Sequence, residues 1–517
     1  MKKMKKILAM LLALTMVLGM SLTSMADVGL PKEGNSKDVT VSNVEAGSKL
    51  NAYQLIDAVY AGENKDEGFV KYVWDFNFTY ENADGDLVTI TEGSDVVFDE
   101  LGENIPLLTS ELVTQLAANS TVLANWEKDV PEVTVDSNST SAVMNLDAGT
   151  WMILVTPADS AVKVYNPMIA SVYYVNSGSD DTMNEGEDAT VNAGGSWELE
   201  TTNAYTKSSP VAIDKVFVTA NTDTAYETPY LDWVAFDDVI TYKVTTTVPD
   251  YSDEYLNAVF KIYDGMENGL VLDTTKDITV KANEVELAAE KYTLTSDTHS
   301  LEVAFDSEWI LDNANAVVEI EYSAKVTESA TLNDDSNDNK VVLTYTDKPN
   351  STKTTEPIRI KVYTFGTDKD IKKVDEKGVA LPGATFTLTN NDTNKVYTSV
   401  SDESGDVCFN GLDVGTYTLK ETIAPNGYTI NGEEFTVVVS AEYDNTGKTK
   451  TSHSIKIVES VDEQGNVTYA ENVTITNTKL NALPSTGGIG TTIFTVAGCG
   501  IMIAAAFFFF ASRKKEN

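Results

Sequence analysis

The sequence predicts an all-β protein made of tandem antiparallel, immunoglobulin-like β-sandwiches, with a minor helix in the N-terminal part. Many segments alternate apolar or aromatic residues with polar ones, as Ile240–Val248 and Val318–Val326 do. This period of two is typical of strands that bury one face. Thr, Val and Tyr are abundant, and Asn, Asp and Gly interrupt the runs, as in sandwiches. The segment Thr109–Trp126 instead has roughly helical spacing of its apolar residues, which are Leu112, Leu116, Leu123 and Trp126.

The first 26 residues are typical of a secretory signal peptide. Met1–Lys6 is positively charged, and Ile7–Leu22 is apolar but too short for a confident membrane span. Ser24 and Ala26 then supply small residues at both specificity positions of a signal peptidase site. The alternative is an N-terminal membrane anchor. We expect residues 1–26 to be removed from a secreted protein.

The C-terminus carries the five-residue motif LPSTG at 483–487, an apolar stretch and a basic tail in that order. The apolar residues 491–510 are long enough to cross a bilayer as a helix, and the basic residues 513–515 would stay in the cytoplasm. Residues 481–517 therefore resemble the cell-wall sorting signal of Gram-positive surface proteins, with LPSTG as a variant of LPxTG. The resemblance implies that a sortase cleaves after Thr486 and holds its carbonyl as a thioester until an amine replaces the enzyme. The motif consists of Leu483, Pro484, Ser485, Thr486 and Gly487.

The mature chain, residues 27–486, is strongly acidic. Trimming both ends removes seven of the 37 basic residues and one of the 79 acidic residues, which leaves a net charge of −48. This charge argues against nucleic acid or an anionic membrane as a partner. The length suits about three domains. Seams near residues 208–210 and 364–366 divide it into a first module (27–207), a second module (208–362) and a third module (363–480).

Cysteine and histidine are too scarce for several common kinds of site. The chain has only Cys408 and Cys499, and Cys499 falls in the predicted membrane span. A mature chain with one cysteine has no internal disulfide, so its stability must come from packing or from another cross-link. His299 and His453 are the only histidines, too few for a His-based metal site or a Ser-His relay. The chain has no P-loop, GxGxxG or HExxH motif, and we expect neither a turnover enzyme nor a cofactor.

Two acidic turns offer oxygen ligands of the kind that calcium prefers. They are Asp84–Asp86 and Asp334–Asp338. Neither matches an EF-hand loop, and acidic turns are usually only solvated. We therefore expect no metal site.

A lysine in the strand Pro210–Val218 shares a face with apolar residues. Alternation places Lys215 on the same face as Val211, Ile213 and Phe217. Burying an unpaired ammonium costs several kcal/mol. The face therefore predicts a partner for this lysine inside the sandwich.

Other polar residues fall on apolar faces in the same way. In the second module, Asp264 aligns with Phe260 and Ile262, and Asn339 aligns with Val341 and Leu343. The third module repeats the order of lysine, carboxylate and asparagine with Lys373, Glu421 and Asn477. The first module offers no comparable set, and we predict no cross-link there.

Such a trio allows two interpretations. It can be a satisfied polar cluster. Alternatively, a desolvated lysine has a lowered pKa and becomes a nucleophile, while a buried carboxylic acid has a raised pKa and can polarise the asparagine carbonyl and move protons. Attack on the side-chain amide would release ammonia and leave an amide bond between the first and last strands of a module. A cross-link closing so long a loop is worth about 4–5 kcal/mol on the entropic model.

These segments resemble the major backbone pilin of Gram-positive, sortase-assembled pili. The second module matches its middle domain through IDKVF, FKIYD and the NxxxLxY strand. The third is similar to a Cna B-type domain through KKVD, LPGATFTL, GTYTLKETIAPNGY and VTITNTK. The resemblance implies a Lys215–Asn339 bond assisted by Asp264 and a Lys373–Asn477 bond assisted by Glu421. Asp237 and Asp238 remain alternative acids in the second module.

The family also uses an exposed lysine for polymerisation, in a motif of the form WxxxVxVYPK. The nearest stretch here is Trp197–Lys207, which is one residue longer and has Thr206 where proline is usual. The resemblance implies that Lys207 receives the Thr486 acyl group of another subunit. The alternative is an ordinary solvated linker lysine.

The resemblance as a whole implies a secreted, wall-anchored backbone pilin at the surface of a Gram-positive bacterium. Its partners would be sortase, identical subunits, accessory pilins and peptidoglycan. A base pilin is usually shorter, and a tip pilin carries an additional adhesive domain that is not evident here. The main alternative is a wall-anchored adhesin that is never polymerised and binds a host surface protein through its first module.

Overall fold

The computed structural model describes most of the mature chain, and the predicted all-β class is confirmed. The described residues are 30–66, 68–96, 108–126, 130–160, 162–176, 197–219, 230–251, 255–480 and 502. The predicted signal peptide, the LPSTG motif and, apart from Met502, the span 491–510 lie outside them. No helix within the described ranges is long and apolar enough to span a membrane.

The chain divides into two compact units. The first comprises Met1–Asp232, Asp237–Ser329 and Asn337–Lys361. The second comprises Trp233–Phe236, Ala330–Ser336 and Val362–Asn517.

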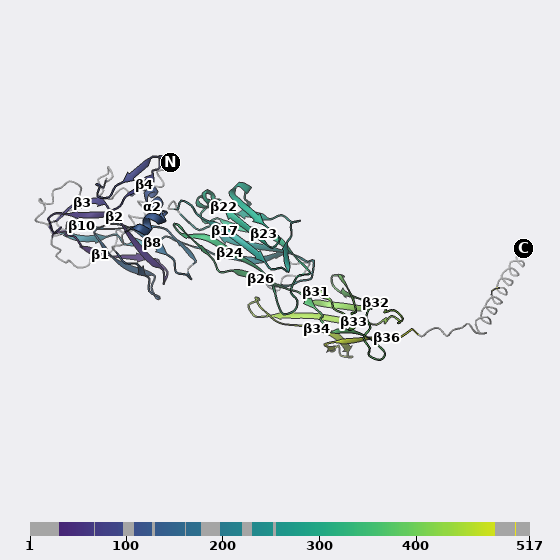
Figure 1. Cartoon of the computed structure of the whole chain (residues 1–517). Coiled ribbons are helices and arrows are strands. Elements are labelled where there is room, and N and C mark those ends of the chain that lie inside the picture. The colour runs from purple at the N-terminus through teal and green to yellow at the C-terminus, as the bar shows by residue number, and fades with distance from the viewer. Residues whose placement is uncertain are drawn as a thin grey trace. The chain divides into compact units, whose positions relative to one another are not determined.

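The N-terminal part of the first unit holds two main sheets around an apolar core (Figure 1). One has the order β12-β1-β7, and the other has the order β11-β10-β8-β2-β3 with β6 beside β2. Two short pairs, β4–β5 and β13–β9, complete this part. The strands are β1 (Ser36–Ser42), β2 (Lys49–Tyr60), β3 (Phe69–Trp74), β4 (Phe78–Glu81), β5 (Leu87–Ile90), β6 (Val133–Thr134), β7 (Ser141–Asp147), β8 (Gly149–Thr156), β9 (Lys163–Tyr165), β10 (Met168–Asn176), β11 (Trp197–Thr201), β12 (Ala204–Tyr205) and β13 (Ser208–Pro210).

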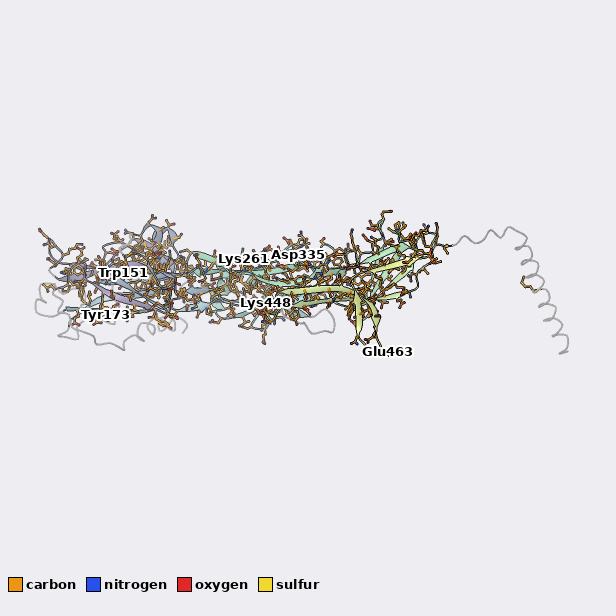
Figure 2. All side chains as sticks on the ribbon, turned by 90° about the horizontal axis from the view of Figure 1, so that it is seen from below. Trp151, Tyr173, Lys261, Asp335, Lys448 and Glu463 are labelled. Carbon is orange, nitrogen blue, oxygen red and sulfur yellow. The ribbon has the colours of Figure 1, made fainter. Side chains whose placement is uncertain are left out.

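Alternation explains how this part buries its core. In β7, every second residue is buried, and the buried ones are Ala142, Met144 and Leu146. The facing side chains include Trp151 on β8 (labelled in Figure 2), which is only 1% exposed. Val143 and Asn145, which lie between them, are exposed. The strands therefore present one apolar face each, as a half-buried sheet requires.

The predicted helix is present but divided in two. It forms α2 (Ser110–Ala117) and α3 (Ser120–Asn125). Thr109 caps α2 by accepting a hydrogen bond from the backbone N–H of Leu112. Asn119 caps α3 in the same way, because an asparagine side chain satisfies free N–H groups at a helix start. A helix was correctly predicted in this segment, but the prediction that it is a single continuous helix was wrong.

Two further sheets lie between residues 213 and 363. One has the order β14-β16-β23-β19-β20 with β18 beside β23, and the other has the order β15-β26-β24-β17-β22-β21 with β25 beside β24. A short helix, α4 (Ser307–Asp312), and the 3-10 turn η2 (Ala289–Lys291) accompany them. The strands are β14 (Ile213–Thr219), β15 (Leu231–Trp233), β16 (Val239–Thr247), β17 (Phe260–Met266), β18 (Leu270–Leu272), β19 (Thr279–Ala282), β20 (Val285–Glu286), β21 (Tyr292–Ser296), β22 (Ser300–Phe305), β23 (Val317–Val326), β24 (Asn337–Lys348), β25 (Ser351–Thr354) and β26 (Ile358–Tyr363).

The second unit contains a six-stranded antiparallel sheet, β30-β29-β32-β33-β34-β35, and the short pair β27–β31. Its first long strand, β28, pairs in parallel with its last strand, β36. The hairpin between β34 and β35 carries Glu463 at its tip (Figure 2). The strands are β27 (Phe365–Gly366), β28 (Ile371–Asp375), β29 (Thr385–Asn390), β30 (Val396–Val400), β31 (Asn410–Leu412), β32 (Gly415–Ile423), β33 (Glu434–Tyr443), β34 (Lys450–Val461), β35 (Val467–Ala470) and β36 (Val473–Asn477).

Candidate cross-linking sites and linking lysine

The second module buries its lysine next to a carboxylate. Lys215 on β14 and Asp264 on β17 are both fully buried. The Lys215 Nζ lies 2.6 Å from Asp264 Oδ2. Because β14 and β17 belong to different sheets, the pair bridges the interior of the sandwich.

Tyr322 on β23 connects this pair to the asparagine. Its hydroxyl donates to Asp264 Oδ1 at 2.6 Å and accepts from Asn339 Nδ2 at 2.8 Å. Asn339 on β24 is fully buried, and its Oδ1 has no hydrogen-bond partner among the described residues. A buried carbonyl oxygen without a partner is costly, so this amide is not a fully satisfied member of the cluster.

Burial shifts both ionisable groups toward their neutral forms. Loss of water lowers the pKa of Lys215 to about 8, although the Asp264 charge partly opposes this. Burial also raises the pKa of Asp264. The rings of Tyr242 and Tyr322 lie 4.9 Å and 5.5 Å from the Lys215 Nζ. A proton passed from Lys215 to Asp264 would leave a neutral amine and a carboxylic acid side by side.

The alternative acids lie elsewhere. Asp237 is exposed, has a positive φ of 68°, and pairs with Lys325 at 2.7 Å. Asp238 immediately precedes β16, and its backbone carbonyl accepts from the backbone N–H of Val326. The carboxylate that contacts Lys215 is that of Asp264.

The third module arranges the same residue types differently. Lys373 on β28 is fully buried, and its Nζ donates to Asn477 Oδ1 on β36. It also donates to the carbonyl of Ile475 at 3.2 Å. Glu421 Oε2 on β32 is 3.6 Å from the same nitrogen. Burial lowers the pKa of Lys373, which favours the nucleophilic amine.

Glu421 is held on both oxygens. Asn477 Nδ2 donates to its Oε1 at 2.6 Å, and the backbone N–H of Asn431 donates to its Oε2 at 2.8 Å. The amide of Asn477 thus turns its carbonyl to the lysine and its nitrogen to the acid. This orientation suits attack at the amide carbon with departure of ammonia, because the acid is next to the leaving nitrogen.

The strand positions correct one expectation. In the third module the lysine lies on β28, the first long strand, and the asparagine lies on β36, the last strand. These two strands pair in parallel. In the second module Asn339 lies on β24, which two more strands follow. The prediction that the first and last strands would be joined is therefore wrong for the second module, where the two residues lie on different sheets.

Two participating residues were missed by reasoning from the sequence. Tyr322 could have been found, because alternation in Val318–Val326 places it on the buried face with Ile320 and Ala324. Asn431 could not, because its contact with Glu421 runs through the backbone, which carries no residue signature.

The first module contains no such trio among its described residues. Its buried polar residues between 30 and 207 are Ser48, Gln54, Thr114, Thr150, Asn166 and Thr206. Its described lysines in ion pairs, such as Lys163 with Glu45 at 2.9 Å, are not fully buried.

Lys207 lies between β12 and β13 and is exposed. Alternation continues through this segment, because Ala204 and Thr206 are buried whereas Tyr205 is 67% exposed. Within the described part of the chain, the Lys207 ammonium makes no hydrogen bond or ion pair.

The acidic turns and the cysteine add no further site. The described residues hold no group of three His, Cys, Asp or Glu side chains that could bind a metal ion. Asp334 instead pairs with Lys450 at 3.5 Å. Cys408 is an exposed free thiol.

Comparisons with known proteins agree with this architecture. Residues 367–454 match the SpaA prealbumin-like fold domain, and residues 475–517 match the LPXTG cell wall anchor motif. The trypsin-resistant surface T6 protein of Streptococcus pyogenes serotype M6 is 22% identical over 98% of this chain and 99% of its own length.

Solved structures extend the match to the fold. The T6 backbone pilin, described as a modular three-domain structure, aligns with a TM-score of 0.60 and 20% identity, covering 88% of this chain and 100% of T6. The major pilin SpaD of Corynebacterium diphtheriae aligns with a TM-score of 0.44 and 17% identity over 86% of this chain and 98% of SpaD. The chain therefore has the fold of the T6 backbone pilin and carries a prealbumin-like fold domain and an LPXTG cell wall anchor motif.

Proposed function

We propose that this chain is the repeating subunit of a covalent pilus, joined head to tail through Thr486 of one copy and Lys207 of the next. The observation that carries the proposal is the exposed amine of Lys207, which pairs with none of the described residues, in a chain whose C-terminal residues match a cell wall anchor motif. A head-to-tail contact whose rotation does not close into a ring yields an open fibre.

The joining reaction needs only groups that sortase and the subunits supply. Sortase replaces Gly487 at the Thr486 carbonyl and holds it as a thioester. The Lys207 Nζ attacks that carbonyl, an amide forms, and the enzyme's thiol leaves with the proton that the amine gives up. The chain is a substrate of the ligase, and peptidoglycan supplies the amine that ends growth.

Replacing the linking lysine tests this function in the producing bacterium. Lys207→Ala should enter the wall only as monomers, whereas the wild-type chain gives a high-mass ladder when wall extracts are boiled in detergent. Lys49→Ala, at another exposed lysine of the first module (53% exposed side chain), should leave the ladder intact. A persistent ladder from Lys207→Ala would reject the linking role, and a wild-type chain without a ladder would favour the non-polymerised adhesin.

Within each subunit, the buried trios support two internal amide bonds, Lys215–Asn339 and Lys373–Asn477. Asp264 and Glu421 act as the acids that assist them, and each bond forms once with loss of one ammonia. The division into modules 27–207, 208–362 and 363–480 follows, with one bond in each of the last two. Residues 27–486, purified after folding, should weigh two ammonia masses less than the sequence requires. A measured mass equal to the mass that the sequence requires would instead mean that both trios are polar clusters without a bond.

A further inference from the structure

The residue before the proposed linking lysine is fully buried and bonded in both directions to one partner. Asn43 Nδ2 donates to the carbonyl of Thr206 at 2.9 Å, and the Thr206 hydroxyl donates to the carbonyl of Asn43. Thr206 is 0% exposed. Its backbone N–H also donates to the carbonyl of Ser42 at 3.0 Å. Side chain and backbone of Thr206 are therefore all engaged by the end of β1.

The peptide bond on the other side of the lysine is held as well. The backbone N–H of Asn166 donates to the carbonyl of Lys207 at 3.2 Å. Tyr205 is in register with Ser42 in the parallel pair β1–β12, and Ser208 is in register with Tyr165 in β9–β13. Lys207 thus lies between two short strand pairs with the backbone carbonyls on both sides bonded. Its side chain is exposed.

Asn43 has the conformation that this bonding requires. Its φ of 62° lies in the left-handed region, which asparagine tolerates better than most residues. In this conformation its own carbonyl and its side-chain amide both reach Thr206. A residue that cannot adopt a positive φ or cannot donate from its side chain would lose one half of the pair.

We propose that Asn43 and Thr206 form a clamp that fixes the backbone of Lys207, so that its amine projects from one defined place toward the acyl-enzyme. Proline would fix such a backbone through its ring, but the residue before Lys207 is a threonine. Here two reciprocal hydrogen bonds between Asn43 and Thr206 fix the backbone instead. Asn43 and Thr206 are positioning residues, since they act through Lys207, and holding the attacking amine in place raises the rate of acyl transfer. The inference rests on the proposed linking role of Lys207.

Three variants of the full-length protein in the producing bacterium test the clamp. Thr206→Val removes the hydroxyl at nearly constant shape, and Thr206→Ser keeps it. Asn43→Gly keeps the positive φ and removes only the side-chain donor. We expect Thr206→Val and Asn43→Gly each to reduce the ladder by about tenfold, the effect of one lost hydrogen bond, and Thr206→Ser to stay near wild type.

Two measurements on the purified chains separate positioning from folding. The unfolding temperature should stay well above the growth temperature in all variants. Labelling of Lys207 by a small N-hydroxysuccinimide ester should be unchanged, because a small reagent reaches an exposed amine whatever its orientation.

Each other outcome overturns the clamp. A wild-type ladder from both Thr206→Val and Asn43→Gly would do so while leaving the linking role intact, provided that Lys207→Ala abolishes the ladder. A ladder that falls only in proportion to unfolded protein would assign the pair a purely structural role. A ladder that survives Lys207→Ala would remove the linking role itself, and the clamp with it.

Discussion

Tyr322 is the residue that distinguishes the two buried trios. In the third module Glu421 contacts both Lys373 and Asn477 directly. In the second module Asp264 contacts Lys215 but reaches Asn339 through the Tyr322 hydroxyl. An aspartate is one methylene shorter than a glutamate, and the tyrosine fills the remaining gap. Burial raises the pKa of Tyr322 well above its ordinary value, so it stays a neutral relay.

Removing the assisting acid should block the bond in the second module. Asp264→Ala leaves Lys215 buried without a carboxylate to take its proton or polarise the amide. The mature variant should then weigh one ammonia mass less than its own sequence requires, whereas the wild type weighs two less, because the bond in the third module is retained. Asp237→Ala, at the exposed neighbour that pairs with Lys325, is the matched control and should change nothing. A bond that forms normally without Asp264 would refute its role.

Formation of the same bond should depend on pH. Only the neutral amine attacks, and the pKa of Lys215 is lowered to about 8. Above this pH most of the amine is neutral. Each pH unit below it lowers the neutral fraction of Lys215 about tenfold. Chains that have never folded can be refolded between pH 6 and 9 while ammonia loss is followed by mass spectrometry. The rate should fall as pH falls below about 8, and a rate that is constant across this range would contradict the argument.

At the scale of elements, the parallel pair β28–β36 explains what a cross-link would add to the third module. The two strands lie next to each other in register, with Lys373 opposite Ile475. In sequence, however, most of the module lies between the two strands, because Lys373 and Asn477 are 104 residues apart. Hydrogen bonds alone close this loop in the unbonded protein, and a covalent link would remove much of the unfolded chain's freedom.

Asn477→Ala should therefore destabilise the third module strongly. The expected loss in the free energy of unfolding is about 4–5 kcal/mol from the cross-link, together with the cost of leaving Lys373 without its amide partner. Chemical denaturation of the mature chain measures it. Asn445→Ala, at an exposed turn residue, is the control and should stay near wild type. Equal stability of both variants would mean that no cross-link is present in the wild type.

Strand faces were more predictable than strand partners. Alternation placed Lys215, Asp264 and Asn339 on buried faces because a strand with one buried side leaves no other register. It could not decide among Asp237, Asp238 and Asp264, since that choice depends on which strands meet across the sandwich. The helix at Thr109–Trp126 was found from its periodicity, but its division at Asn119 depends on a capping bond that spacing does not reveal.

For the whole molecule, the two ends and the strongly patterned modules carried most of the information. The predicted sorting signal is confirmed by the match to the LPXTG anchor, and the Cna B-type resemblance agrees with the prealbumin-like match over residues 367–454. The fold of the first module was predictable only as a class, because its sheets join strands far apart in sequence, such as β1 with β12. The cross-links and the linking lysine stay predictions until the masses and the ladder are measured.

The place of Lys207 between β12 and β13 has a mechanical consequence. In a fibre joined as proposed, tension enters each subunit at Lys207 and leaves it at Thr486. The residues before Lys207 lie outside the covalent path between these two points. The first module can therefore dispense with a covalent brace, and its loops can lengthen or change without weakening the fibre under load.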